Sequence, residues 1–173
     1  MQVRALDDPI VIGHLTEAQR RLSAVALVHK RLYRDDSVEA VDLGRYLEDI
    51  CLDMQRTMGD EWKGLLTFEL APLLISTDRA VNMGLILTEL IINANKYAYD
   101  GSPGVVVIRL EQHRHRFRLT VSDRGLGSHQ SGKGFGTRMM TAMVQRLAGT
   151  IEFMKNDPGL RVVVDAPMAE TLD

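Results

Sequence analysis

The chain has 173 residues and a formal net charge of -2, with a composition typical of a soluble globular protein. This charge balance gives no reason to expect a nucleic-acid-binding surface or attraction to an anionic membrane. The single cysteine, Cys51, excludes an internal disulfide. With no bilayer-length apolar run and no signal-like N-terminus, we expect a cytoplasmic protein.

The first predicted element is an amphipathic helix. Its apolar positions recur at alternating intervals of three and four residues, as in a heptad seam. The seam positions are Leu15, Ala18, Leu22, Val25, His29 and Leu32. Such a seam needs a partner helix, which comes from the rest of the chain, from sequence outside it, or from a second copy in a homodimer.

A second helix, two short strands and a third helix are predicted next. Asp42 is suited to cap a helix that ends near Thr57. The stretch GLLTFELAPLLIS predicts two strands interrupted near Pro72. Thr77 or Asp78 is expected to cap a long helix that ends near Tyr99.

The rest of the chain alternates strands with one more helix. VVVIRLEQH and RFRLTVSD predict a hairpin, followed by a glycine-rich loop, a helix over residues 137–147, and strands over 151–154 and 161–165. This order predicts an α+β fold, a two-layer sandwich whose mixed or mostly antiparallel sheet is covered by helices on one face. We expect a helical segment over residues 1–58 and a second domain over residues 59–173.

The stretch TELIINANKYAYD carries three polar residues in an apolar run: Glu89, Asn93 and Lys96. A continuous helix would place them along one face. A polar side chain among apolar neighbours costs free energy unless it is satisfied. An amide oxygen suits a hard cation such as Mg²⁺, an ammonium group suits phosphate oxygens, and a carboxylate suits proton acceptance.

The stretch VSDRGLGSHQSGKGFG brings a carboxylate, Asp123, to a strand end and follows it with glycines. Asp123 is suited to accept a hydrogen bond from an exocyclic amine such as that of adenine. Free amides before a helix and the charge of Lys133 favour an anion such as phosphate. Each feature has an ordinary structural alternative, such as a flexible hairpin loop, a core amide or a solvated helix end. Together they favour a nucleotide.

With these motifs in this order, the sequence resembles the catalytic, ATP-binding domain of sensor histidine kinases, a GHKL ATPase with the Bergerat fold. TELIINANKYAY resembles the N box, DRGLG the first glycine box, and GKGFGTRMMTAMVQRLAGTIEF the second with its helix and following strand. EAQRRLSAVALVHKRLY and VDLGRYLEDI resemble the region before that domain in the HWE-like subgroup, where it forms the second helix of the dimerisation and phosphotransfer hairpin. The resemblance covers residues 1–167.

The resemblance implies that the chain binds ATP and Mg²⁺. Asn93 would bind Mg²⁺, and Lys96 and Tyr97 would contact the phosphates or the sugar. Asp123 would read adenine, and Glu89 would help to activate the phosphoryl acceptor. The remaining residues implied at the nucleotide site are Gly125, Gly127, Gly132, Lys133, Gly134, Gly136 and Thr137.

The implied function is transfer of the ATP γ-phosphoryl to a histidine and then to an aspartate on the receiver domain of a response regulator. The chain departs from the family in two ways: its lid is only SHQS, and it lacks the acceptor motif, so we expect the acceptor histidine outside this chain. His29 is expected to pack in the seam, and His14 lacks the neighbours of an acceptor. Two alternatives remain, a GHKL serine kinase of the anti-sigma type and a non-catalytic ATP-binding module that docks a receiver domain.

Overall fold

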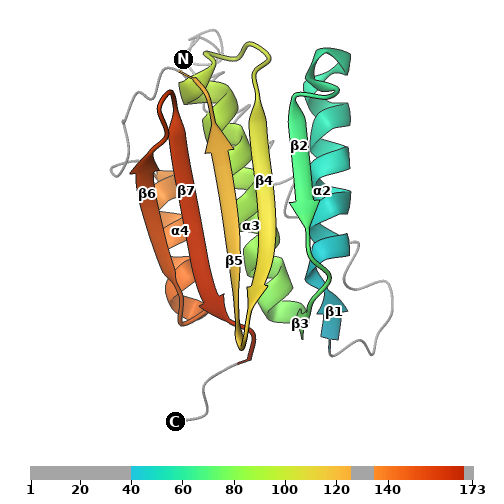
Figure 1. Cartoon of the computed structure of the whole chain (residues 1–173), viewed down its shortest axis with the longest axis vertical. Coiled ribbons are helices and arrows are strands. Elements are labelled where there is room, and N and C mark those ends of the chain that lie inside the picture. The colour runs from blue at the N-terminus through green and yellow to red at the C-terminus, as the bar shows by residue number, and fades with distance from the viewer. Residues whose placement is uncertain (1–39, 126–134, 170–173) are drawn as a thin grey trace, which may run out of the picture.

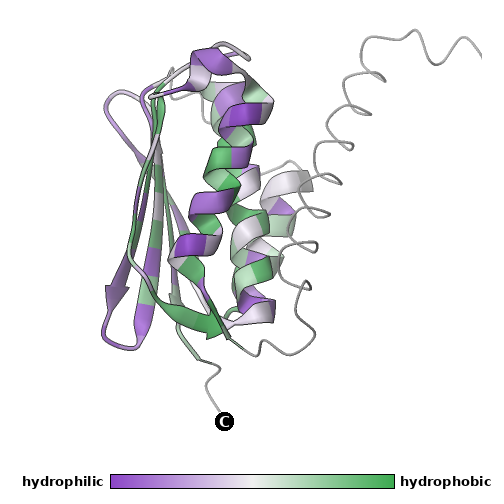
Figure 2. Cartoon of the chain, turned by 90° about the vertical axis from the view of Figure 1, so that its right-hand side faces the viewer, coloured by the Kyte–Doolittle hydropathy of each residue, from purple (hydrophilic) through white to green (hydrophobic). Residues whose placement is uncertain are grey.

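The structure, a computed structural model, describes residues 40–125 and 135–169. Five strands form one sheet in the order β2-β4-β5-β7-β6, and the helices lie on one face of it (Figure 1). Seen from the side, the sheet is one layer and the helices are the other (Figure 2). The predicted α+β sandwich is therefore confirmed. The seam predicted over residues 15–32, with His14 and His29, lies outside the described residues.

The sheet is mixed, as predicted. Strand β2 (Leu66–Leu70) pairs in parallel with β4 (Val106–His113), and every other pairing is antiparallel. The predicted hairpins are β4 with β5 (Arg116–Asp123) and β6 (Thr150–Lys155) with β7 (Leu160–Pro167). Along β5 the buried residues Phe117, Leu119 and Val121 alternate with more exposed ones. This period of two sends one side of each strand to the helices.

Helix α2 (Leu43–Met58) begins as the sequence predicted. Asp42 is its N-cap residue, and the side chain accepts a hydrogen bond from the Arg45 amide at 3.3 Å. A short strand that the sequence did not predict, β1 (Ala40–Asp42), precedes it and pairs antiparallel with β3 (Leu74–Ser76). The 3-10 turn η2 (Asp60–Trp62) follows and buries Trp62.

Helix α3 (Thr77–Asn93) is the central helix, and eleven of its residues are buried, on almost all of its sides. A helix that is buried on most of its sides belongs in an interior, and α3 packs against the sheet with α2 and α4 as its neighbours. The predicted cap was wrong: the N-cap residue is Ser76, whose side chain makes no capping hydrogen bond. Thr77 and Asp78 already lie in the first turn, where the Asp78 carboxylate favours the positive end of the helix dipole.

Helix α4 (Phe135–Arg146) is already helical at Phe135, earlier than residue 137, where the sequence predicted its start. Gly136 therefore lies within the helix and not in the loop before it. Leu43, Leu47, Ile50 and Cys51 of α2 share one core cluster with residues of α3, α4 and the sheet. The division between residues 1–58 and 59–173 stays a prediction, and α2, which precedes that division, contributes to the core that follows it.

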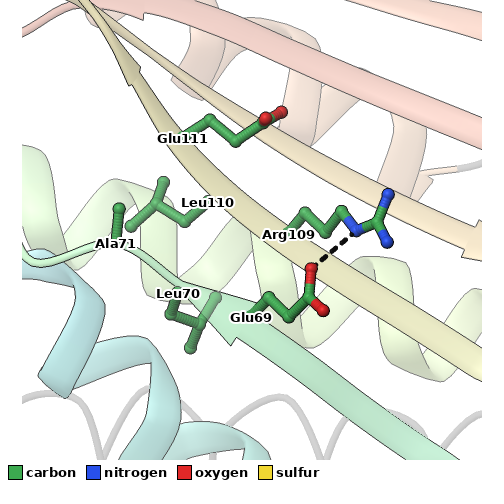
Figure 3. Close-up of a pocket in the computed structure, with 6 residues that line it drawn as sticks. All are labelled: Glu69, Leu70, Ala71, Arg109, Leu110 and Glu111. Atoms are coloured by element: carbon green, nitrogen blue, oxygen red, sulfur yellow. Dashed lines mark ion pairs between the residues drawn. The ribbon is translucent and has the colours of Figure 1, made fainter.

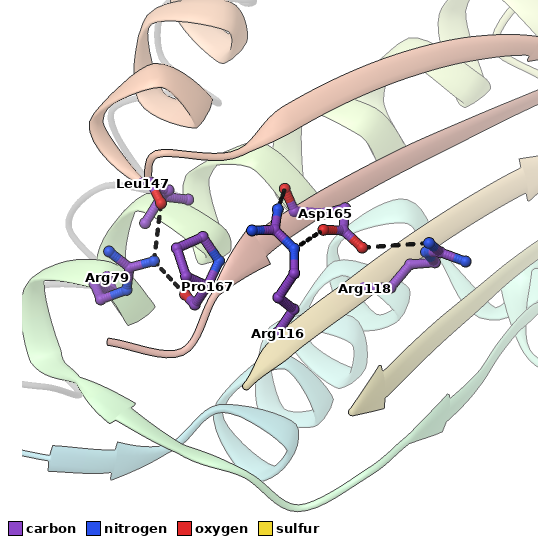
Figure 4. Close-up of polar contacts among 6 residues, drawn as sticks. All are labelled: Arg79, Arg116, Arg118, Leu147, Asp165 and Pro167. Atoms are coloured by element: carbon purple, nitrogen blue, oxygen red, sulfur yellow. Dashed lines mark hydrogen bonds and ion pairs between the residues drawn. The ribbon is translucent and has the colours of Figure 1, made fainter. Parts of the chain in front are cut away.

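Two groups of arginine contacts fix the end of the sandwich that lies away from the end of β5 (Figure 4). The buried side chain of Arg79, on α3, donates hydrogen bonds to the carbonyl oxygen of Leu147 at 3.0 Å and to that of Pro167. On the outer face of the sheet, Asp165 accepts from Arg116 and, at 3.3 Å, from Arg118. Arg79 thus connects the start of α3 to the ends of α4 and β7.

Within residues 40–125 and 135–169, no helix has both the length and the apolar character needed to cross a membrane.

The thiol of Cys51 predicts how stability depends on pH. Burial raises its pKa to about 12 from an ordinary 9.0, and the carboxylate of Glu48 adds to the shift. The raised pKa stabilises the fold fully below pH 9.0, and this contribution is lost as the pH rises toward about 12. Three pKa units correspond to roughly 4 kcal/mol. Urea unfolding across this range should show that loss, and Cys51→Ala should flatten it. Parallel curves for the two proteins would contradict the prediction.

Candidate functional site

The end of the central helix carries the polar residues that the sequence singled out. After Asn93 the backbone changes from α-helix to a π-helical segment, η3 (Ala94–Ala98), which holds Lys96 and Tyr97. Single π turns inside helices occur often at functional sites. Because the π turn is wider than an α turn, Lys96 does not follow Asn93 at the α-helical spacing that the sequence predicted.

The three polar residues differ in exposure. Glu89 is 2 % exposed, Asn93 is half-buried and Lys96 is exposed. The Lys96 Nζ atom lies 5.2 Å from the centre of the Tyr97 ring, within the range of a cation–π contact. The helix end therefore runs from a buried carboxylate, through a partly accessible amide, to an ammonium group at the surface.

Asp123 continues the inward-facing series of β5 and places a carboxylate where the pattern calls for an apolar residue. It is 6 % exposed, so its charge needs hydrogen-bond donors. Its Oδ1 atom accepts from the backbone amides of Gly125 at 3.0 Å and Leu160 at 3.1 Å. Among the described residues no donor reaches Oδ2, which leaves that oxygen to accept a hydrogen bond from a ligand.

Tyr99 and Gly125 join the helix end to the end of β5. The Tyr99 hydroxyl donates to the carbonyl oxygen of Val105 at 2.6 Å and accepts from the Arg124 amide at 2.8 Å. A Cβ atom at Gly125 would lie 2.3 Å from the carbonyl oxygen of Ala98, so only glycine permits this approach. Figure 1 shows α3 and β5 ending at the same end of the sandwich. The structure thus brings the segment of Lys96 and Tyr97 beside that of Asp123.

The surroundings of Tyr99 keep its hydroxyl neutral. Burial raises the pKa of Tyr99, and the negative charge of Asp123 adds to this, against the opposing effects of the Arg124 amide and guanidinium. The Tyr99 ring also packs edge-on against Trp62, with ring centres 6.4 Å apart. A neutral hydroxyl both donates and accepts, which its two hydrogen bonds require.

The second glycine box is described only in part. Gly136 is buried and Thr137 half-buried, both in the first turn of α4. The other predicted residues of this loop, Gly127, Gly132, Lys133 and Gly134, lie outside the described residues. The described part of the predicted site therefore comprises residues of the helix end, the end of β5 and the start of α4.

Sequence reasoning missed two parts of the site. Tyr99 is part of the stretch TELIINANKYAYD, where the sequence predicts only the end of a helix. The NDPG turn, residues 156–159, is a recognisable turn sequence. It was not connected to Asp123 because that contact depends on the pairing of β7 with β5, where Arg161 lies opposite Ser122.

A hollow along β2 and β4 is a different feature (Figure 3). Its lining residues are Glu69, Leu70, Ala71, Arg109, Leu110 and Glu111. Arg109 and Glu69 neutralise each other across it at 3.0 Å. On β4 it lies beyond Val106, which pairs with Asp123, toward the far end of the sheet. We therefore do not assign the nucleotide to this hollow.

Metal binding by a protein cage has no support in the described residues, where no group of three or more His, Cys, Asp or Glu side chains is suited to an ion. Mg²⁺ does not need such a cage, because it commonly binds through one or two protein oxygens together with phosphates and waters. The partly accessible amide of Asn93 fits that mode.

Two families match the sequence. Residues 65–164 match the family described as histidine kinase-like ATPase domain, and residues 1–58 match the family described as histidine kinase.

Curated relatives include the sensor histidine kinase PdtaS of Mycobacterium tuberculosis, 28 % identical over 149 residues, which are 84 % of this chain and 29 % of PdtaS. Blue-light-activated histidine kinase 2 of Erythrobacter litoralis is 24 % identical over 164 residues, 87 % of this chain and 46 % of that protein. The chain thus spans less than half the length of these two relatives.

Solved structures share the fold. The histidine kinase domain of a blue-light activated histidine kinase from Erythrobacter litoralis has a TM-score of 0.74 at 23 % identity, over 87 % of this chain and 74 % of that one. The ATP binding domain of PrrB from Mycobacterium tuberculosis has a TM-score of 0.64 at 20 % identity, over 79 % of this chain and 100 % of that one.

Tyr99→Phe tests whether the Tyr99 hydroxyl fixes the segment after Asp123. The variant keeps the ring against Trp62 and loses both hydrogen bonds, so we expect unfolding to require about 1–2 kcal/mol less. Hydrogen exchange of the Arg124 amide should become at least tenfold faster. Thr57→Val, which loses a hydroxyl bonded only within α2, should leave that exchange unchanged. Equal exchange rates in Tyr99→Phe and the unmodified protein would contradict the role given to Tyr99.

Proposed function

The chain belongs to the family of histidine kinase-like ATPase domains, and from that premise we propose that it binds ATP with Mg²⁺ and transfers the γ-phosphoryl to a histidine outside this chain. The observation that carries the proposal is the contact between the helix end and the end of β5 through Tyr99–Arg124 and Gly125–Ala98. This contact joins the segment that carries Asn93 and Lys96 to the segment that carries Asp123, which supports a single site formed by both.

Each described polar group has one role in the proposal. The Oδ2 atom of Asp123 accepts a hydrogen bond from the exocyclic amine of adenine. Lys96 and Tyr97 lie on the accessible part of the helix end, where they contact the phosphates or sugar. Gly136 and Thr137, at the start of α4, lie where a helix N-terminus favours phosphate.

The amide oxygen of Asn93 would hold Mg²⁺ together with phosphate oxygens. When bound, Mg²⁺ supplies positive charge that favours the developing negative charge on the transferring and leaving groups. The other residues of the site bind ATP and orient its γ-phosphoryl group, because phosphoryl transfer relies mainly on positioning and electrostatics.

The transfer step breaks one bond and forms one. An imidazole nitrogen of the acceptor histidine attacks the γ-phosphorus, and the bond from the γ-phosphorus to its bridging oxygen breaks, which releases ADP with the electron pair. The proton lost from the imidazole passes to the carboxylate of Glu89. Glu89 lies one α-helical turn before Asn93, which places the proton acceptor close to the metal-suited amide.

In the full pathway, the phosphoryl group then moves from histidine to an aspartate on a response-regulator receiver domain. We propose that the predicted seam over residues 15–32 supports a homodimer and that the protein acts in the cytoplasm. The sensor histidine kinases among the curated relatives support the two-component assignment over a serine kinase of the anti-sigma type.

Asn93→Ala tests nucleotide binding. Loss of the metal-suited oxygen should weaken binding of a non-hydrolysable ATP analogue with Mg²⁺ at least tenfold in calorimetry, because even a hydrogen bond to a charged group contributes about 1.5–3 kcal/mol. Asn95→Ala removes a second amide from the same segment and should change the affinity less than twofold. Absence of binding by the unmodified protein, or equal affinity for Asn93→Ala, would refute the proposal.

Glu89→Gln tests the transfer step. With labelled ATP and a separate hairpin-helix fragment that carries an acceptor histidine, we expect acid-labile phosphohistidine from the unmodified protein. The variant should bind ATP normally and transfer at least 100-fold more slowly, because general bases contribute about 10²–10⁴-fold. ATP binding without any transfer would instead favour the non-catalytic module, and acid-stable phosphoserine on a protein substrate would favour the serine kinase.

A further inference from the structure

We propose that the turn between β6 and β7, residues 156–159, is a positioning device that sets the base preference of the site by holding Asp123, with Asn156 as its principal residue. The inference rests on the proposed function, because it concerns how the adenine-reading carboxylate is aimed. It adds a residue 33 positions away in the chain to a site that the helix end and glycine boxes otherwise define.

The turn holds Asp123 at two atoms. The Nδ2 atom of Asn156 donates to the Asp123 carbonyl oxygen at 2.7 Å. The backbone amide of Leu160, just after the turn, donates to Asp123 Oδ1 at 3.1 Å. Backbone and carboxylate are thus both fixed by one short segment, which leaves the Asp123 side chain little freedom to rotate.

Close packing of the turn against Asp123 requires glycine. Gly159 has φ +107°, a conformation that L side chains rarely adopt. A Cβ atom there would lie 2.1 Å from the Asp123 carbonyl oxygen and 2.7 Å from its Oδ1 atom. The Gly159 carbonyl oxygen accepts a hydrogen bond from the backbone N–H of Asn156 at 2.9 Å, which closes the turn.

The orientation of the Asn156 amide is set from its other side. Arg161 donates to the Asn156 Oδ1 atom at 3.4 Å, which directs Oδ1 toward the guanidinium and Nδ2 toward Asp123. An aspartate at position 156 would keep the partner for Arg161 and lose the donor to Asp123. Asn156→Asp is thus a near-isosteric change that removes that hydrogen bond and adds a negative charge, and Asn156→Ala removes the hydrogen bond without adding a charge.

The preference for one base follows from the different roles of the two Asp123 carboxylate oxygens. Oδ1 accepts two backbone amides, from Gly125 and Leu160, so the oxygen left for a ligand is Oδ2. A carboxylate oxygen accepts and does not donate, so it favours a base edge with an amine over one with a carbonyl. If the turn no longer holds Asp123, the preference for a base with an amine should weaken, while binding of the sugar and phosphates should change less.

The experiment compares two nucleotides that differ only at the base. ATP carries an exocyclic amine, and purine riboside 5′-triphosphate lacks it. With Mg²⁺ present, calorimetry should show that the unmodified protein binds ATP at least tenfold more tightly, the worth of one hydrogen bond to a charged group. In Asn156→Asp and Asn156→Ala the ATP affinity should fall severalfold or more, while the affinity for the analogue stays within twofold.

Gln112→Glu is the matched control, because the Gln112 amide donates to the Arg114 carbonyl oxygen in the other hairpin turn, at 3.2 Å. It should leave both affinities unchanged. If the Asn156 variants lose affinity for the two nucleotides equally, Asn156 has only a structural role and the inference is overturned. Unchanged affinities for both nucleotides would also overturn it. Failure of the unmodified protein to bind either nucleotide would refute the proposed function itself, and the inference with it.

Discussion

The structure depends on the hydrogen bonds that the nearly buried carboxylate of Asp123 accepts at the C-terminal end of β5. Asp123 occupies a position that the strand pattern reserves for apolar side chains, and its buried charge requires hydrogen-bond donors. Gly125 supplies one from the next loop and Leu160 supplies another from β7. Because these donors come from two segments, the carboxylate fixes where the glycine-rich loop begins and how the β6–β7 turn packs.

The same end of the sandwich receives the central helix, and Tyr99 joins the two. Its hydroxyl reaches both the turn before β4 and the backbone after Asp123, so one side chain connects three segments. The π-helical segment before it carries Lys96 and Tyr97 to the surface, while Glu89 stays in the interior. The polar groups of the helix end therefore range from a buried carboxylate to an exposed ammonium, and this helix end is joined to the end of β5 that carries Asp123.

Local chemistry made much of this predictable. The stretches VVVIRLEQH and RFRLTVSD predicted β4 and β5, Asp42 predicted the start of α2, and the polar interruptions of α3 indicated the helix end that carries the candidate site. Contacts that depend on long-range register were not predictable: Asn156 meets Asp123 only because β7 lies beside β5. The π turn was also missed, because an apolar pattern at α-helical spacing does not reveal a local widening. The cap of α3 was misplaced because Ser76, Thr77 and Asp78 are all acceptable N-cap residues.

The central claim is that Asp123, held at Oδ1, reads a nucleotide base through Oδ2. The most direct measurement is the ratio of ATP to GTP affinity, with Mg²⁺, for the unmodified protein and for Asp123→Asn. An asparagine keeps an oxygen for the Gly125 and Leu160 amides and presents a donor in place of Oδ2. The account predicts a strong preference for ATP in the unmodified protein and loss or reversal of that preference in the variant. An equal preference for ATP in both proteins would contradict it.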